Sequence, residues 1–170
     1  MGLKVIFKTE KRKLLDKLAY YGIENLKYLL IHSGNEKIRA YSGILSTEEL
    51  NDLNKIIGID TIGCYFFTDH GNEIRLSPEA IMLLKQDINN NVISLNEEQA
   101  QEWLVGQDIN LDNLQLPNQT NGFKVIKIKE DLISMGKLSS NKLMNYLPKE
   151  RRIKLKKLLK KITAELQHQK

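Results

Sequence analysis

Five cationic side chains gather toward the C-terminal end of the chain, and their types and spacing favour one kind of chemistry. An arginine guanidinium can hold two phosphate oxygens at once, whereas a lysine ammonium acts as a point charge. A cluster of both therefore suits a phosphate backbone, with the arginines contributing most, although any single lysine is more typical of ordinary surface charge. The cluster consists of Lys137, Lys142, Lys149, Arg151 and Arg152.

The charge of the chain is concentrated in the same region. Residues 1–136 hold 15 Lys and Arg against 19 Asp and Glu, a net −4, whereas residues 137–170 hold 11 against 2, a net +9. Each cation that neutralises a phosphate releases condensed counterions, which makes a nucleic acid a natural partner. On composition alone, two alternatives stay open: a solvated helix face, and an anchor for acidic lipid.

The sequence does not show the patterns of common catalytic or cofactor sites. The histidines, His32, His70 and His168, lack metal-ligand spacing, and there is no GxGxxG or GxxxxGK[ST] motif. The single cysteine, Cys64, lies in an apolar strand pattern, where a thiol packs as a small apolar group. We therefore expect no catalytic residue, no metal and no cofactor.

Length and composition bound the class of protein. The 170 residues are 41% hydrophobic and 28% charged, which is typical of a soluble globular protein with one ordinary domain or two small ones. One cysteine excludes an intramolecular disulfide and favours a reducing compartment, so we expect a cytoplasmic protein. No apolar run approaches the roughly 18 residues of a membrane span, and the first residues lack the order of a signal peptide.

The first half of the chain, residues 1–89, predicts an α/β domain. Thr9 and Ser46 are expected to cap two helices, and Ser77 with Pro78 a third. The first helix ends before Gly22, and the second ends at Gly58. The second should bury Leu50, Leu53, Ile56 and Ile57, and the third should carry Ile81, Met82 and Leu84. The strands are expected at residues 26–33 and 37–42, which form a hairpin, and at 61–68 and 73–76.

The pattern restarts near Asn90, which predicts a second domain over residues 90–152. Asn96 is expected to cap a helix that ends at Gly106 and places Trp103 in the core. A strand at 92–95, a loop at 107–121, and strands at 122–129, 132–138 and 142–147 complete a small antiparallel sheet. Pro148 then opens a basic amphipathic helix, with residues 153–170 as its remainder. Its apolar side is expected to pack on its own domain, and packing on a partner stays as the alternative.

The second half resembles a PUA domain, with a strand leading into a helix that ends in Gly106 and later strands that run to Gly136 and Lys137. It is most similar to the PUA-like C-terminal domain of the Nop/Sun RNA cytosine-5 methyltransferases. That domain ends in Gly-Lys, a short hairpin, and Lys-Asn-x-x-Pro-Lys followed by arginine. The present chain has Met144 in place of the first lysine of that pattern, and Ser134 where a glycine is usual.

The order of elements in the first half is similar to the pre-PUA domain of Nip7-like ribosome-assembly proteins. The two resemblances imply an α+β fold: an N-terminal α/β pre-PUA-like domain, a C-terminal PUA-like β pseudobarrel, and a basic C-terminal helix. The methyltransferase body, with its methyl-donor loop and paired cysteines, has no counterpart in these residues.

The resemblance, with the charge pattern, implies a non-catalytic RNA-binding protein that recognises structured rRNA or tRNA. It would act as a ribosome-assembly factor or as the RNA-docking subunit of a modification enzyme, with a methyltransferase or a pre-ribosomal particle as protein partner and no membrane or DNA partner. An enzyme subunit with a site in the first domain, and a ribosome-bound structural protein, stay as alternatives. Gly106 and Gly136 either let RNA approach closely or serve as a helix stop and a strand turn. The residues expected to bind RNA are Gly106, Gly136, Lys137, Lys142, Lys149, Arg151, Arg152 and Lys157.

Overall fold

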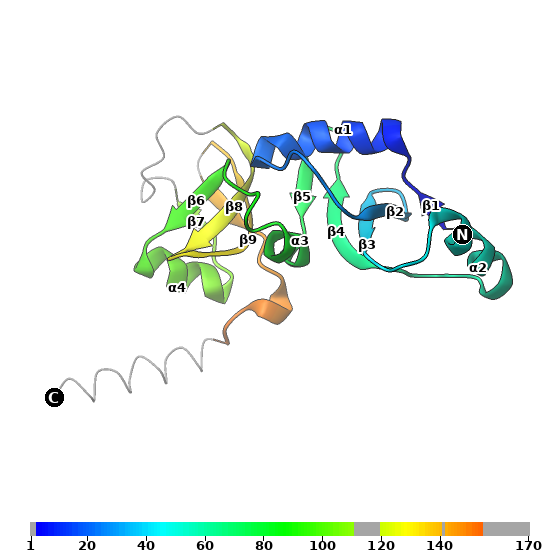
Figure 1. Ribbon diagram of the computed structural model, residues 1–170. Helices are drawn as coiled ribbons and strands as arrows, with labels where there is room; N and C mark the ends of the chain where they lie inside the picture. The colour runs from blue at the N-terminus through cyan, green and yellow to red at the C-terminus, as the bar shows by residue number, and fades with distance from the viewer. Residues whose placement is uncertain (1–2, 111–119, 141, 155–170) are drawn as a thin grey trace. The chain divides into compact units, whose positions relative to one another are not determined.

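The computed structural model describes residues 3–110, 120–140 and 142–154. The chain divides into two compact units, Met1–Val92 and Ile93–Lys170, close to the boundary expected before residue 90 (Figure 1). Each unit contains a five-stranded sheet together with helices, so the expected α+β class is confirmed. Among the described residues, no helix is long and apolar enough to span a bilayer.

The first unit is built on an antiparallel meander in which the strands follow one another across the sheet in the order β1-β2-β3-β4-β5. Its largest fully buried side chains include Tyr21, Phe66 and Phe67. The strands are β1 (Lys4–Val5), β2 (Leu29–Ser33), β3 (Lys37–Tyr41), β4 (Cys64–Asp69) and β5 (Ile74–Leu76). The helices are α1 (Lys8–Leu18), the 3-10 turn η1 (Ala19–Tyr21), α2 (Thr47–Ile57) and α3 (Pro78–Leu83).

The capping signals of this unit are mostly confirmed. Ser46 and Glu49 form the predicted capping box at the start of α2, and Ser77 accepts the hydrogen bond that caps α3. The cap predicted at Thr9 is wrong, because α1 begins at Lys8 and Thr9 lies inside its first turn. The N-cap residue is instead Phe7, which offers no side-chain acceptor.

Two predicted apolar helix faces are only partly buried. In α2, Leu50 is buried, but Ile56 and Ile57 are 79% and 65% exposed. In α3, Ile81 is buried and Met82 is 69% exposed. Helical spacing identifies one apolar stripe, but how much of the stripe is covered depends on tertiary packing, which no local pattern reports.

The second unit contains a sheet of order β6-β8-β9-β10-β7, with helix α4 (Glu97–Val105) between the first two strands in sequence. Asn96 and Gln99 form a capping box, and Gly106 ends α4 with a φ of 95°. The strands are β6 (Val92–Leu95), β7 (Ile109–Asn110), β8 (Gly122–Ile128), β9 (Asp131–Leu138) and β10 (Lys142–Asn145).

Trp103 lies at the centre of the second core, as predicted, and is fully buried. Its indole Nε1 donates a 2.8 Å hydrogen bond to Ser134 Oγ. This bond gives a structural role to the serine that stands where the methyltransferase PUA-like pattern usually has glycine. A buried indole N–H without an acceptor would be destabilising, so this bond stabilises the core. The other members of the cluster are Ile93, Leu95, Ile109, Ile126, Leu138 and Leu143.

Three expectations for the second unit need correction. The predicted loop at 107–121 contains β7, which pairs with β10. Lys124 lies in the strand predicted at 122–129, where a lysine would ordinarily be exposed, but it is fully buried. The helix predicted from Pro148 is instead one 3-10 turn, η3 (Lys149–Arg151), after which Arg152 is extended. The backbone N–H of Ile153 donates to Leu104 O at 2.8 Å, a tertiary contact that competes with helix propagation. The rest of the predicted tail lies outside the described residues.

Candidate functional site

The cationic residues predicted to bind RNA are brought onto neighbouring elements of the second unit, β9, β10 and η3. The antiparallel register places Met144 directly opposite Lys137, and Asn145 opposite Gly136. The chain then turns at Pro148 into η3, which carries Lys149 and Arg151. Lys149 and Arg151 are exposed, whereas Lys137, Lys142 and Arg152 are half-buried. We call these five cations the β9–β10 basic surface. Lys157 lies outside the described residues.

Asp108, which the sequence analysis did not single out, neutralises part of this charge. Lys142 Nζ lies 2.9 Å from Asp108 Oδ2, and the backbone N–H of Asn145 donates to Asp108 Oδ1 at 2.8 Å. The hydrogen bond from Asn145, followed by that from Lys142, holds the pKa of Asp108 below its usual value. The ion pair of Lys142 with Asp108 therefore links β10 to the loop after α4, and the carboxylate neutralises part of the charge of Lys142.

Asn145 connects the end of α4 to β10. Its Nδ2 donates to Trp103 O at 2.8 Å and to Gln107 O at 3.0 Å, and its Oδ1 accepts from the backbone N–H of Leu147 at 2.8 Å. The last carbonyls of a helix have no partner within the helix, so a side-chain amide that binds one of them stabilises this end of α4. The same side chain fixes the course of the chain toward η3.

Gly106 and Arg152 contact each other. A Cβ added to Gly106 would lie 2.7 Å from Arg152 Cδ, Nε and Nη1, so the arginine occupies the space that the glycine leaves free. Arg152 Nε also donates to Leu147 O at 3.0 Å. The helix stop at Gly106 is confirmed by its left-handed backbone, and the missing side chain makes room for Arg152. A further role of either residue in RNA contact stays a prediction.

Gly136 faces the core of the second unit. A Cβ at this position would lie 2.8 Å from Trp103 Cη2, 2.9 Å from Leu143 Cδ1 and 3.2 Å from Ile126 Cδ1. The first two distances are shorter than real Cβ contacts and the third is tight, so close packing of β9 against Trp103 accounts for the glycine.

An aromatic cluster lies beside the cations. Lys137 Nζ sits 4.9 Å from the centroid of the Phe123 ring, a cation–π distance. The ring of Tyr146 meets Phe123 edge to face, with centroids 5.3 Å apart and an interplanar angle of 83°. Tyr146 is 36% exposed, whereas Phe123 is buried. Selection of residues by charge does not reveal these two aromatics. The spacing of Met144 and Tyr146, two residues apart, is a signal that both side chains lie on the face of Lys137.

The match to a known protein family lies in the second half of the chain. Residues 90–153 match the family model described as the Methyltransferase RsmF PUA domain. These residues form a PUA-like domain. A ribosomal RNA small subunit methyltransferase F from Aliivibrio fischeri is 34% identical over 89 residues, which are 52% of this chain and 18% of that protein. The corresponding protein of Photobacterium profundum is 31% identical over 102 residues, 58% of this chain and 21% of that protein. The chain thus spans about a fifth of the length of these curated relatives.

A solved structure extends the likeness beyond the PUA-like domain. The conserved PUA domain protein from Thermoplasma acidophilum aligns with a TM-score of 0.53 and 13% identity, over 85% of this chain and 93% of that chain. A coverage of 85% includes part of the first unit as well as the second. The resemblance of the sequence to PUA-domain proteins is therefore confirmed at the level of fold.

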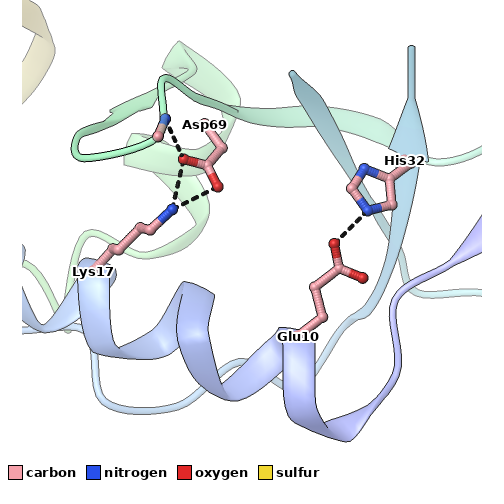
Figure 2. Close-up of polar contacts among 5 residues, drawn as sticks. Glu10, Lys17, His32 and Asp69 are labelled. Carbon is pink, nitrogen blue, oxygen red and sulfur yellow. Dashed lines mark hydrogen bonds and ion pairs between the residues drawn. The ribbon is translucent and has the colours of Figure 1, made fainter. Parts of the chain in front are cut away.

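The first unit contains close contacts between acidic and basic side chains. Figure 2 shows two ties between α1 and the sheet: Glu10 Oε1 lies 2.7 Å from His32 Nε2, and Lys17 Nζ lies 2.7 Å from Asp69 Oδ2. Within the described ranges, no group of three or more His, Cys, Asp or Glu side chains is arranged to hold a metal ion. Cys64 is half-buried at the start of β4.

A cavity of about 550 Å³ lies on this unit and is lined by residues that include His32, Arg39 and Asp60. The Arg39 guanidinium donates to Ile62 O and Gly63 O, so it ties β3 to the segment before β4. His32 is already paired with Glu10. These contacts brace the sheet.

Proposed function

We propose that this chain is a non-catalytic RNA-binding protein that recognises structured rRNA or tRNA through its PUA-like domain. The observation that carries the proposal is the placement of the β9–β10 basic surface on a domain that matches the PUA domain of an rRNA methyltransferase family. The proposal includes a cytoplasmic role as a ribosome-assembly factor or as an RNA-docking subunit for a methyltransferase.

We assign different roles to the five cations according to their exposure and their contacts. Lys149 and Arg151 are exposed and follow each other closely on η3, so they are placed to bind phosphates. Lys137 lies over the Phe123 ring, on the strand that pairs with β10. Lys142 and Arg152 are engaged with Asp108 and Leu147 O, so we assign them mainly to positioning β10 and η3.

Salt-dependent binding tests the proposal with the double variant Lys149→Ala and Arg151→Ala. The wild-type chain should bind a labelled rRNA hairpin with an affinity that falls steeply with salt concentration, because each phosphate contact releases counterions. Removing two such contacts should weaken binding and reduce the slope of log K against log salt by roughly 1.5 units. Fluorescence anisotropy at four salt concentrations measures both quantities.

A matched control removes two exposed lysines from the first unit, Lys8 and Lys27, and so changes the net charge equally. This control should keep the wild-type slope and affinity. Equal weakening in both double variants would mean that net charge alone attracts RNA and that the β9–β10 basic surface is not the site. Methyl transfer to RNA by the isolated chain would contradict the non-catalytic part, and sedimentation with mature subunits instead of precursors would favour a structural ribosomal role.

A further inference from the structure

Tyr146 occupies a position where an aromatic ring and cations meet on one face of a sheet. Directly opposed residues of antiparallel strands point to the same face, and residues two apart on a strand share a face. Lys137 therefore shares its face with Phe123, its partner on β8, and with Met144, its partner on β10. Tyr146 follows two residues after Met144, and its contact with Phe123 places its ring on this face too.

Neighbouring residues fix the backbone at Tyr146, and one buried aromatic side chain packs against its ring. Phe123, which is buried, meets it edge to face at 5.3 Å. The backbone N–H of Tyr146 donates to Met135 O at 3.2 Å. The preceding Asn145 makes three hydrogen bonds through its side chain, and the following Leu147 is buried. A side chain on a fixed backbone, packed on one buried ring, loses less conformational freedom when a ligand packs on it than a fully solvated side chain does.

Tyr146 is nonetheless 36% exposed, and cationic residues lie near it across the sheet and along the chain. Lys137 lies over the same Phe123 ring, and η3 with Lys149 and Arg151 begins three residues after Tyr146. Proteins that bind unpaired nucleotides combine these two features: cations follow the backbone, and aromatic rings stack on bases. Paired bases are stacked within the helix and give such a ring no free face, so the combination selects an unpaired base.

We propose that Tyr146 stacks on an unpaired base of the bound RNA, while Lys137, Lys149 and Arg151 hold the flanking phosphates. The inference rests on the proposed RNA-binding function and deepens it, because it names a loop or bulge as the recognised element. Stacking does not discriminate strongly among bases, so this contact supplies a preference for unpaired over paired RNA.

A tryptophan reporter tests the stacking directly. The chain has one tryptophan, Trp103, which is fully buried and should not respond to bound RNA. In the variant Tyr146→Trp, the new indole should be quenched when a hairpin RNA with an unpaired loop is added. A fully paired duplex of the same length should give little quenching. Anisotropy of labelled RNA, recorded on the same samples, shows whether each RNA is bound.

Affinity measurements give a second test. Tyr146→Ala should weaken the looped hairpin at least about 5-fold, as expected for loss of one stacked base, and change duplex binding by less than 2-fold. Tyr146→Phe keeps the ring and should bind like the wild type. Tyr20 is the matched control, because it is 37% exposed and meets Tyr21 edge to face at 5.1 Å, but belongs to the first unit. Tyr20→Ala should leave the affinity for the hairpin unchanged, and the new indole of Tyr20→Trp should not be quenched when the hairpin is added.

The outcomes separate this inference from the proposed function. If the hairpin binds and Tyr146→Trp is not quenched, the stacking is wrong and the RNA-binding proposal stands. If Tyr146→Ala weakens hairpin and duplex equally, the residue acts on folding or general affinity, which also overturns the inference. If the wild-type chain binds neither RNA, the proposed function fails and the stacking fails with it.

Discussion

Replacement of Gly106 by alanine measures how Gly106 and Arg152 depend on each other. The glycine has a φ of 95°, and an L residue in that region costs about 1 kcal/mol. The added Cβ would also lie 2.7 Å from three atoms of Arg152. The arginine is flexible and can move away, but it then loses its hydrogen bond to Leu147 O, which contributes about 1 kcal/mol. We therefore expect Gly106→Ala to lower the free energy of unfolding by about 2 kcal/mol.

Denaturation of four proteins resolves the two contributions: the wild type, Gly106→Ala, Arg152→Ala and the double variant. When Arg152 is already alanine, the new methyl group meets no arginine, so Gly106→Ala should cost only the backbone strain, about 1 kcal/mol. Gly34→Ala is a control for strain alone, because Gly34 has a φ of 75° and a Cβ there would meet no atom within 4 Å. If Gly106→Ala costs the same free energy with arginine or alanine at position 152, displacement of Arg152 is not the source of the second contribution.

Two further substitutions test the interactions that support the PUA-like domain. Asp108→Asn should destabilise the protein at pH 7 by on the order of 1 kcal/mol. Asparagine lacks the negative charge that pairs with Lys142 and is a weaker acceptor for the backbone N–H of Asn145. Folding lowers the pKa of Asp108, so its contribution is present above the unfolded pKa of about 3.9 and is lost as the pH falls through the lower folded value. The stabilities of wild type and variant in urea denaturation should therefore converge as the pH falls below about 3.9, and a constant difference would contradict the assignment. Ser134→Ala removes the acceptor of the Trp103 indole and should cost about 1 to 3 kcal/mol in thermal denaturation, whereas an unchanged melting temperature would show that the indole finds another partner.

Local signals in the sequence were sufficient for much of the secondary structure. The capping box at Ser46 and the stops at Gly58 and Gly106 depend only on residues within one helical turn, and all three are confirmed. The cap at Thr9 was wrong because α1 begins without any side-chain cap, so the sequence carries no signal for that boundary. Its start depends on packing beyond the helix itself.

The arrangement of the candidate site was less accessible, because it depends on contacts between distant residues. Asp108 and Lys142 are 34 positions apart, and nothing in their local sequence pairs them. The contact between Gly106 and Arg152 likewise joins the end of a helix to a turn that follows the last strand. Sequence reasoning could select these residues as a group by charge and motif. It could not show which cations are paired with a carboxylate, as Lys142 is, or how far each side chain is exposed.

The three hydrogen bonds of Asn145 also bear on how this domain ages. Asparagine is among the thermolabile residues, and hydrolysis of its amide leaves an aspartate. An aspartate at position 145 could accept from the Leu147 N–H, but it could no longer donate to Trp103 O and Gln107 O. It would also place a negative charge at the negative end of the α4 dipole. Hydrolysis of this one amide would therefore remove both side-chain hydrogen bonds from Asn145 to the end of α4.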